Sequence, residues 1–146
     1  MGNKRYVLCT STGCIEYAPQ RYKKYDIGFI RVRLTFKGVE YEEGPELDPV
    51  KFYEEQETIK DPKNNLPSTA IPDAAKVRKQ FDELFDKGYN ELIIIAISSG
   101  LGGTYNELRL IAEEYKEKMK ITVIDSRITS FSEGLLAIKA AQLVEK

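Results

Sequence analysis

The segment from residue 98 to residue 105 carries the densest group of residues that could bind a ligand. It reads Ser-Ser-Gly-Leu-Gly-Gly-Thr-Tyr and comes directly after an apolar run. Its glycines let the backbone approach a ligand closely, while Ser98, Ser99 and Thr104 add hydroxyl donors. A helix that begins here would also offer free N–H groups to an anion. The segment therefore predicts a binding site for a carboxylate or a phosphate group.

Two further polar loops are expected at the same edge of the molecule. Thr10 and Ser11 follow the first apolar strand, and Asp125 and Ser126 follow another one at residues 121–124. In an open α/β sheet, ligands bind just beyond the carboxyl ends of the strands. Thr10, Ser11, Asp125 and Ser126 are therefore secondary candidates for the site.

A dinucleotide site is the obvious enzymatic interpretation of the glycine-rich segment. Gly100 and Gly102 supply the first half of the G-x-G-x-x-G pattern, and Asp125 lies about where a ribose-binding acid belongs. The third glycine of the pattern would fall at Tyr105, whose ring would obstruct the packing of helix against strand. The sequence therefore disfavours this interpretation.

Three less specific interpretations stay open on these residues alone. The segment could be a purely structural turn in which Ser98 and Thr104 only cap the following helix. It could be the phosphate cradle of a small-molecule enzyme, although no Lys or Arg lies beside it and no G-K-[ST] motif is present. It could also belong to a non-catalytic regulatory domain that keeps the loop without using it.

The elements that position these loops alternate between strand-like and helical patterns, which predicts an α/β fold. Short apolar runs at residues 6–9, 92–97 and 121–124 predict adjacent parallel strands buried on both faces. Helical apolar stripes lie near residues 73–87, after the glycine-rich segment, and from about residue 130. We therefore expect a doubly wound, mainly parallel sheet with helices on both faces.

A β-hairpin is expected outside this sheet. Apolar and polar residues alternate over residues 30–36, and Lys37-Gly38 supplies a tight turn. The predicted hairpin runs from Phe29 to Tyr41, and its half-polar face favours a peripheral position. Asp48 as N-cap and Pro49 in the first turn then predict a short helix.

The composition is that of one soluble globular domain. The 146 residues are 42% hydrophobic and 31% charged, and the formal net charge is −1. No overall positive field would attract nucleic acid, and no apolar run approaches the roughly 20 residues that span a bilayer. No apolar stretch of signal-peptide length follows the start, so a cytoplasmic location is expected.

The chain has no histidine and two cysteines, Cys9 and Cys14. A Cys2His2 zinc site is therefore impossible, a four-cysteine site would need a second chain, and no metal site is expected. The usual general base for a serine or cysteine nucleophile is also missing. Cys9 is expected on a buried strand and Cys14 in a loop, both as free thiols.

Several motifs together resemble those of one known family. Ser98–Tyr105 is similar to the S-S-G-L-S-G-T-Y signature of the DegV family of fatty-acid-binding proteins. Pro67–Pro72 resembles the family's P-x-T-S-Q-P segment, and Val123–Ser126 resembles its V-I-D-S strand end. Arg31–Leu34 is similar to an early V-P-L hairpin, and order and spacing agree from Tyr6 to the end of the chain.

The resemblance implies a fold, a ligand and a role. DegV-like proteins have two α/β domains and hold a fatty acid in the tunnel between them. Residues 1–146 would form the N-terminal domain, and the second domain would be absent from this chain. Such proteins present the acyl carboxylate to a separate ATP-dependent fatty-acid kinase. The resemblance therefore implies a long-chain fatty acid as ligand, a kinase as possible partner, no cofactor and no catalysis by this chain.

The resemblance also implies site residues, carried over position by position. Thr69 and Ser99 would bind the lipid carboxylate through their hydroxyls, helped by Ser98 and by backbone N–H groups around Gly100. The structural alternative makes Thr69 a turn residue between two prolines and Ser99 a helix cap.

Two departures from the family pattern stand out. The first strand of the family usually ends in T-D-S, whereas here Ser11 stands between two threonines in place of the acid. The role of that acid is therefore not carried over to Ser11. The Ser-Gly pair of the signature has become Gly102-Gly103, which removes one hydroxyl.

Overall fold

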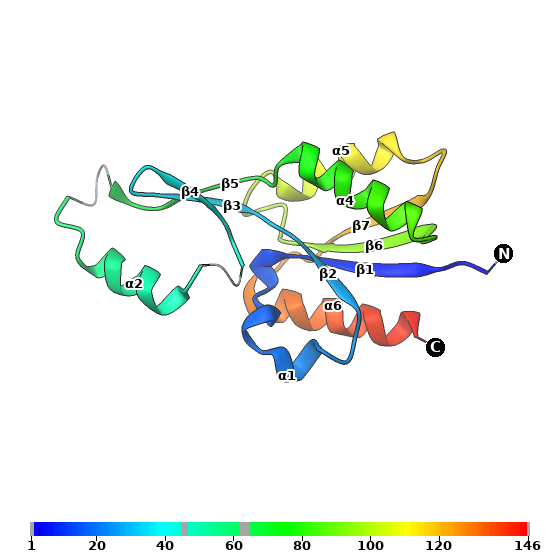
Figure 1. Ribbon diagram of the computed structural model, residues 1–146, viewed down its shortest axis with the longest axis horizontal. Coiled ribbons are helices and arrows are strands. Elements are labelled where there is room, and N and C mark those ends of the chain that lie inside the picture. The colour runs from blue at the N-terminus through cyan, green and yellow to red at the C-terminus, as the bar shows by residue number, and fades with distance from the viewer. Residues whose placement is uncertain (1, 45–46, 62–64, 146) are drawn as a thin grey trace.

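A four-stranded parallel sheet forms the centre of the computed structural model, which describes residues 2–44, 47–61 and 65–145. The strands lie in the order β2 (Ile27–Ile30), β1 (Arg5–Thr10), β6 (Glu91–Ala96) and β7 (Lys120–Asp125) (Figure 1). β1 pairs with both β2 and β6, and β6 pairs with β7, all in parallel. The predicted α/β fold and the adjacency of the three buried strands are confirmed.

One face of this sheet is covered by α4 (Ala74–Asp86) and α5 (Thr104–Glu114). α4 starts where predicted because Asp73 Oδ1 accepts the N–H groups of the next turn, at 2.8 and 3.2 Å. It ends before Gly88, whose φ of +86° suits glycine. This layer has its own buried core, which includes Leu8, Phe81, Leu92, Ile94, Leu108 and Ile111.

The opposite face packs against α6 (Ser130–Val144). Three short turns after β1 join it there: η1 (Ser11–Gly13), η2 (Ile15–Tyr17) and α1 (Pro19–Tyr22). Their core includes Val7, Cys9, Ile15, Ile95, Ala137 and Ile138. Helices therefore lie on both faces of the sheet, as expected for a doubly wound fold. Cys9 is fully buried on β1, Cys14 is half-buried after η1, and both are free.

The contact between α6 and the turns after β1 leaves no room for a side chain at Gly134. A Cβ atom there would overlap Ile15 Cγ2 and lie 2.5 Å from the Gly13 carbonyl oxygen. Replacing glycine by alanine inside a helix normally stabilises a protein by about 0.5–1 kcal/mol. We expect Gly134→Ala to lower the free energy of unfolding instead, by about 1–3 kcal/mol, because the helix and the turn must separate.

Urea unfolding of the two proteins measures this difference. Gly102→Ala is the control, since a Cβ atom at Gly102 meets nothing within 4 Å and its backbone is not in the left-handed region. A Gly134→Ala protein as stable as the parent would contradict the close contact.

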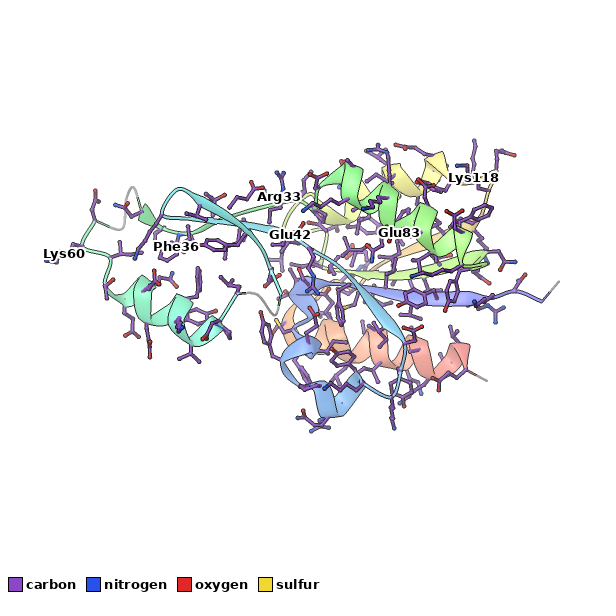
Figure 2. The ribbon with its side chains drawn as sticks, in the orientation of Figure 1. Arg33, Phe36, Glu42, Lys60, Glu83 and Lys118 are labelled. Atoms are coloured by element: carbon purple, nitrogen blue, oxygen red, sulfur yellow. The ribbon has the colours of Figure 1, made fainter. Side chains whose placement is uncertain are left out.

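A separate antiparallel sheet forms an arm on the side where the parallel strands end (Figure 1). It consists of β3 (Arg33–Phe36), β4 (Val39–Glu42) and β5 (Ser68–Ala70), in the order β4-β3-β5, with α2 (Pro49–Glu57) beside it. α2 begins as predicted, since Asp48 Oδ1 accepts two N–H groups at 3.0 and 3.3 Å. Phe36 of β3, labelled in Figure 2, lies in this arm. Its ring packs edge-to-face on Phe52 of α2, with ring centroids 5.1 Å apart.

The predicted hairpin is correct in its turn and in its peripheral position but wrong in its start. Phe29 lies in β2, which pairs with β1 in the main sheet, and the hairpin begins only with β3. Between them, the Val32 N–H donates to Ser11 Oγ at 3.0 Å, and its carbonyl accepts from the Glu43 N–H at 2.9 Å. These hydrogen bonds lie between β2 of the parallel sheet and β3 of the antiparallel sheet, where the chain passes from one sheet to the other. The alternation of apolar and polar residues continues through this point and gives no sign of the change.

Three leucines of α6 remain on the surface. Leu135, Leu136 and Leu143 are 40–58% exposed, whereas Ala137 and Ile138 of the same helix are buried. Only part of the wide apolar stripe of this helix is therefore buried in the core. Within the described ranges, the helices are too short or too polar to cross a membrane.

Candidate functional site

The three predicted polar loops meet beyond the carboxyl ends of the parallel strands. The loop after β1 contacts the end of β6 through Thr10 Oγ1, which accepts the Ile97 N–H at 3.0 Å. The loop after β6 contacts the loop after β7 through the Ser98 N–H, which donates to the Ile128 carbonyl at 3.0 Å. The expected convergence of these loops is confirmed.

Ser99 is bound to Asp125 across two of these loops. The Ser99 hydroxyl donates to Asp125 Oδ2 at 2.6 Å, and the Ser99 N–H donates to Oδ1 at 3.1 Å. The Arg127 N–H donates to the same Oδ1 at 3.0 Å. These hydrogen bonds, the Ser99 hydroxyl first, hold the pKa of Asp125 below its usual value. Asp125 is thus an ionised carboxylate that organises both loops.

Ser98 and Ser126 shape the backbone of their own loops. Ser98 Oγ accepts the Gly100 N–H at 3.2 Å, and Ser126 Oγ accepts an N–H two residues later, also at 3.2 Å. Helix α5 begins after Gly103 without a hydrogen bond from any side-chain cap. The interpretation that Ser98, Ser99 or Thr104 caps this helix is therefore wrong. The first N–H groups of α5 stay uncapped by side chains.

Two adjoining cavities lie where the arm meets the parallel sheet. The larger one, about 650 Å³, is mainly apolar and is lined by Leu34 of β3, Phe52 and Tyr53 of α2, and Leu66. The smaller one, about 300 Å³, reaches residues 101–104 at the start of α5. Three residues line both cavities: Val32, Glu43 and Thr69.

Thr69 therefore lies between the apolar cavity and the glycine-rich loop. It is exposed on β5, in register with Leu34. The loop reaches the smaller cavity through residues 101–104, whereas Ser98, Ser99 and Gly100 lie outside the described lining of both cavities. The structure thus brings Thr69 opposite the later half of the loop and pairs Ser99 with Asp125.

A buried carboxyl group that the sequence did not indicate lies beneath the loop after β1. Glu133, in the first turn of α6, is 0% exposed. It accepts hydrogen bonds from the hydroxyls of Thr10 and Thr12, the latter at 2.9 Å, and lies 3.9 Å from Cys9 Sγ. Burial raises the pKa of Glu133 to about 7. Thr10 and Thr12 therefore direct their hydroxyls to Glu133.

Ser11, which stands where the T-D-S pattern has its acid, is also bound internally. It is 3% exposed, accepts the Val32 N–H, and donates to Glu43 Oε2 at 2.8 Å. Thr10 and Ser11 thus fix the loop to its neighbours. In the described part of the chain, no group of three or more His, Cys, Asp or Glu side chains could hold a metal ion.

Comparison with known sequences adds independent information. The model of the DegV family, described as "Uncharacterised protein, DegV family", matches residues 6–146. Protein DegV of Bacillus subtilis is 30% identical over 139 residues, which make up 94% of this chain and 47% of that protein. DegV domain-containing protein CPE2509 of Clostridium perfringens is 29% identical over 98% of this chain and 48% of that protein. The chain thus spans about half the length of the curated relatives it matches.

Solved structures agree with this assignment. The crystal structure of DegV, a fatty acid binding protein from Bacillus subtilis, has a TM-score of 0.82 at 29% identity, over 99% of this chain and 48% of that one. A DegV family protein from Eubacterium eligens loaded with heptadecanoic acid has a TM-score of 0.79 at 19% identity, over 97% of this chain and 48% of that one. The second comparison shows the fold alone. With a family match over residues 6–146 and the same fold, the chain belongs to the DegV family.

Proposed function

We propose that this chain binds a long-chain fatty acid, with the acyl chain in the larger cavity and the carboxyl group where the two cavities adjoin. The observation that carries the proposal is the position of Thr69, between the apolar cavity of about 650 Å³ and the start of α5. This volume suits a small-molecule site, for which about 300–1,000 Å³ is typical. The fatty acid binding protein from Bacillus subtilis, similar over 99% of this chain, supports this ligand class.

The carboxyl group would be held by the Thr69 hydroxyl and by the loop before α5, with Ser98, Ser99 and Gly100 as its further contacts. A serine hydroxyl has a single proton to donate, and that of Ser99 is donated to Asp125. Ser99 must therefore turn away from Asp125 to donate to the ligand. The alternative is that Ser99 acts only by holding the loop in shape. Two variants separate these roles.

We expect Ser99→Ala to weaken the binding of palmitic acid up to about tenfold, because a hydrogen bond contributes about 0.5–1.5 kcal/mol. Asp125→Asn should leave binding unchanged or strengthen it, since the amide oxygen can still accept the N–H groups of Ser99 and Arg127 while the Ser99 hydroxyl is freed for the ligand. Isothermal titration calorimetry of the three proteins measures these differences. Thr58→Ala, which removes an exposed hydroxyl of the arm, is the control and should bind like the parent.

Equal losses in Ser99→Ala and Asp125→Asn would contradict direct contact and assign Ser99 to loop shape alone. Thermal unfolding of each variant, measured in the absence of fatty acid, separates a lost contact from a lost fold. If neither the parent protein nor any of its variants binds a fatty acid, the proposed function itself is overturned.

A carrier role follows as part of the same proposal, in which the bound fatty acid is presented to a separate fatty-acid kinase. The family resemblance supports this step. An enzyme acting on a phosphorylated molecule is less favoured, because the described residues that line the two cavities include no Lys or Arg. Ser99→Ala should reduce phosphorylation of the bound fatty acid by such a kinase more than it reduces affinity, which a phosphorylation assay with saturating fatty acid measures.

A further inference from the structure

The charge at the junction of the two cavities is negative. Among the described residues that line either cavity, Glu43 is the only one with a formal charge at neutral pH. It lines both cavities, as Thr69 does, so it lies where the proposed function puts the carboxyl group of the ligand. An ionised fatty acid would therefore meet a like charge at this point.

The main chain of Glu43 is fixed on both sides. Its N–H donates to the Val32 carbonyl at 2.9 Å, and its carbonyl accepts from Arg31 Nη1 at 3.1 Å. Its carboxylate is half-buried and accepts the Ser11 hydroxyl at 2.8 Å. These bonds hold Glu43 at the shared wall of the two cavities.

The groups that face Glu43 do not offset its charge. Burial, and then the charge of Glu43, raises the pKa of Cys14 and of Tyr17, so both side chains are neutral. Glu133, whose pKa is raised first by burial and further by the charge of Glu43, is itself an acid. The nearby cation, Arg31, makes a bidentate ion pair with Glu16.

Resting on the proposed function, we infer that the fatty acid binds with its carboxyl group protonated and donates that proton to the Glu43 carboxylate in a shared hydrogen bond. Two carboxyl groups that share one site cannot both ionise, so one of them keeps a proton. Thr69 can then donate to the carbonyl oxygen of the ligand. Each ligand bound at neutral pH takes up one proton from solution, and Glu43 sets the protonation state that the site selects.

The test compares lauric acid with the uncharged 1-dodecanol on the 146-residue protein, at pH 6 to 9 and below the critical micelle concentration of the acid. The Kd for lauric acid should rise about tenfold per pH unit, because one proton is bound with the ligand. The Kd for dodecanol should stay constant. Calorimetry in buffers of different ionisation enthalpy should report about one proton taken up per lauric acid.

Glu43→Gln keeps an acceptor for the Ser11 hydroxyl and removes the charge. This variant should bind lauric acid with little dependence on pH and at least tenfold more tightly than the parent at pH 9. A parent protein that binds lauric acid with no proton uptake and no pH dependence would overturn the inference and leave the proposed function standing. A protein that binds neither lauric acid nor dodecanol would overturn the proposed function as well.

Discussion

The free energy of unfolding is expected to fall by about 2 kcal/mol between pH 4.5 and pH 7 because of Glu133 alone, once partial screening by solvent is allowed for. Burial raises the pKa of Glu133 from 4.5 to about 7 in the folded protein. Between these values the folded protein holds a proton that the unfolded chain has lost. The stabilisation is therefore complete below pH 4.5 and is lost as the pH rises through 7.

Urea unfolding at pH 5 and pH 8 measures this effect, and Glu133→Gln should remove most of it. No histidine titrates in this window, because the chain has none. Glu145→Gln, an exposed glutamate at the end of the same helix, is the matched control and should keep the dependence of the parent. A parent protein equally stable at both pH values would contradict the burial of Glu133.

Affinity for saturated fatty acids should increase steeply with chain length. Each fully buried methylene contributes about 0.8 kcal/mol, which corresponds to a roughly fourfold lower Kd. From decanoic to tetradecanoic acid the gain should reach up to about 3 kcal/mol, more than a hydroxyl of the site contributes. Titration calorimetry with the series gives the slope per methylene.

Two variants of α2 test whether the acyl chain that produces this dependence on chain length lies in the larger cavity. Tyr53→Glu places a charge on the cavity wall and should weaken tetradecanoic acid binding at least tenfold, about 1.4 kcal/mol. Val50→Glu lies on the same helix at similar exposure, 65% against 63%, but outside the lining, and should bind normally. Equal effects of the two charges, or a Kd that does not change with chain length, would contradict an acyl chain in this cavity.

The architecture was predictable because its main elements are coded locally. The run at residues 92–97 is apolar throughout, as a strand covered by helices on both faces must be. The cap at Asp73 and the stop at Gly88 are side-chain and backbone signals within one turn of the helix ends. The break between β2 and β3 was missed because it depends on hydrogen bonds of Val32 with Ser11 and Glu43. Neither residue belongs to the alternating pattern from which the hairpin was predicted.

The candidate site was predictable only in part. The meeting of the three polar loops follows from the parallel order of their strands, which apolar runs reveal. Glu133 was missed because an acid in the first turn of a helix is usually a solvated partner of the helix dipole. Its burial depends on hydroxyls more than 120 residues earlier in the chain. Gly134 beside it was the available signal, since a glycine inside an apolar helix often marks a close approach.

The most direct test of an acyl chain between the arm and the parallel sheet is photolabelling with a diazirine-bearing palmitic acid, followed by peptide mapping. The label should fall on residues that line the larger cavity, foremost Leu34, Tyr53 and Leu66, and unlabelled palmitic acid should suppress it. Labelling concentrated on the exposed leucines of α6, Leu135, Leu136 and Leu143, and insensitive to competition, would contradict the proposed site.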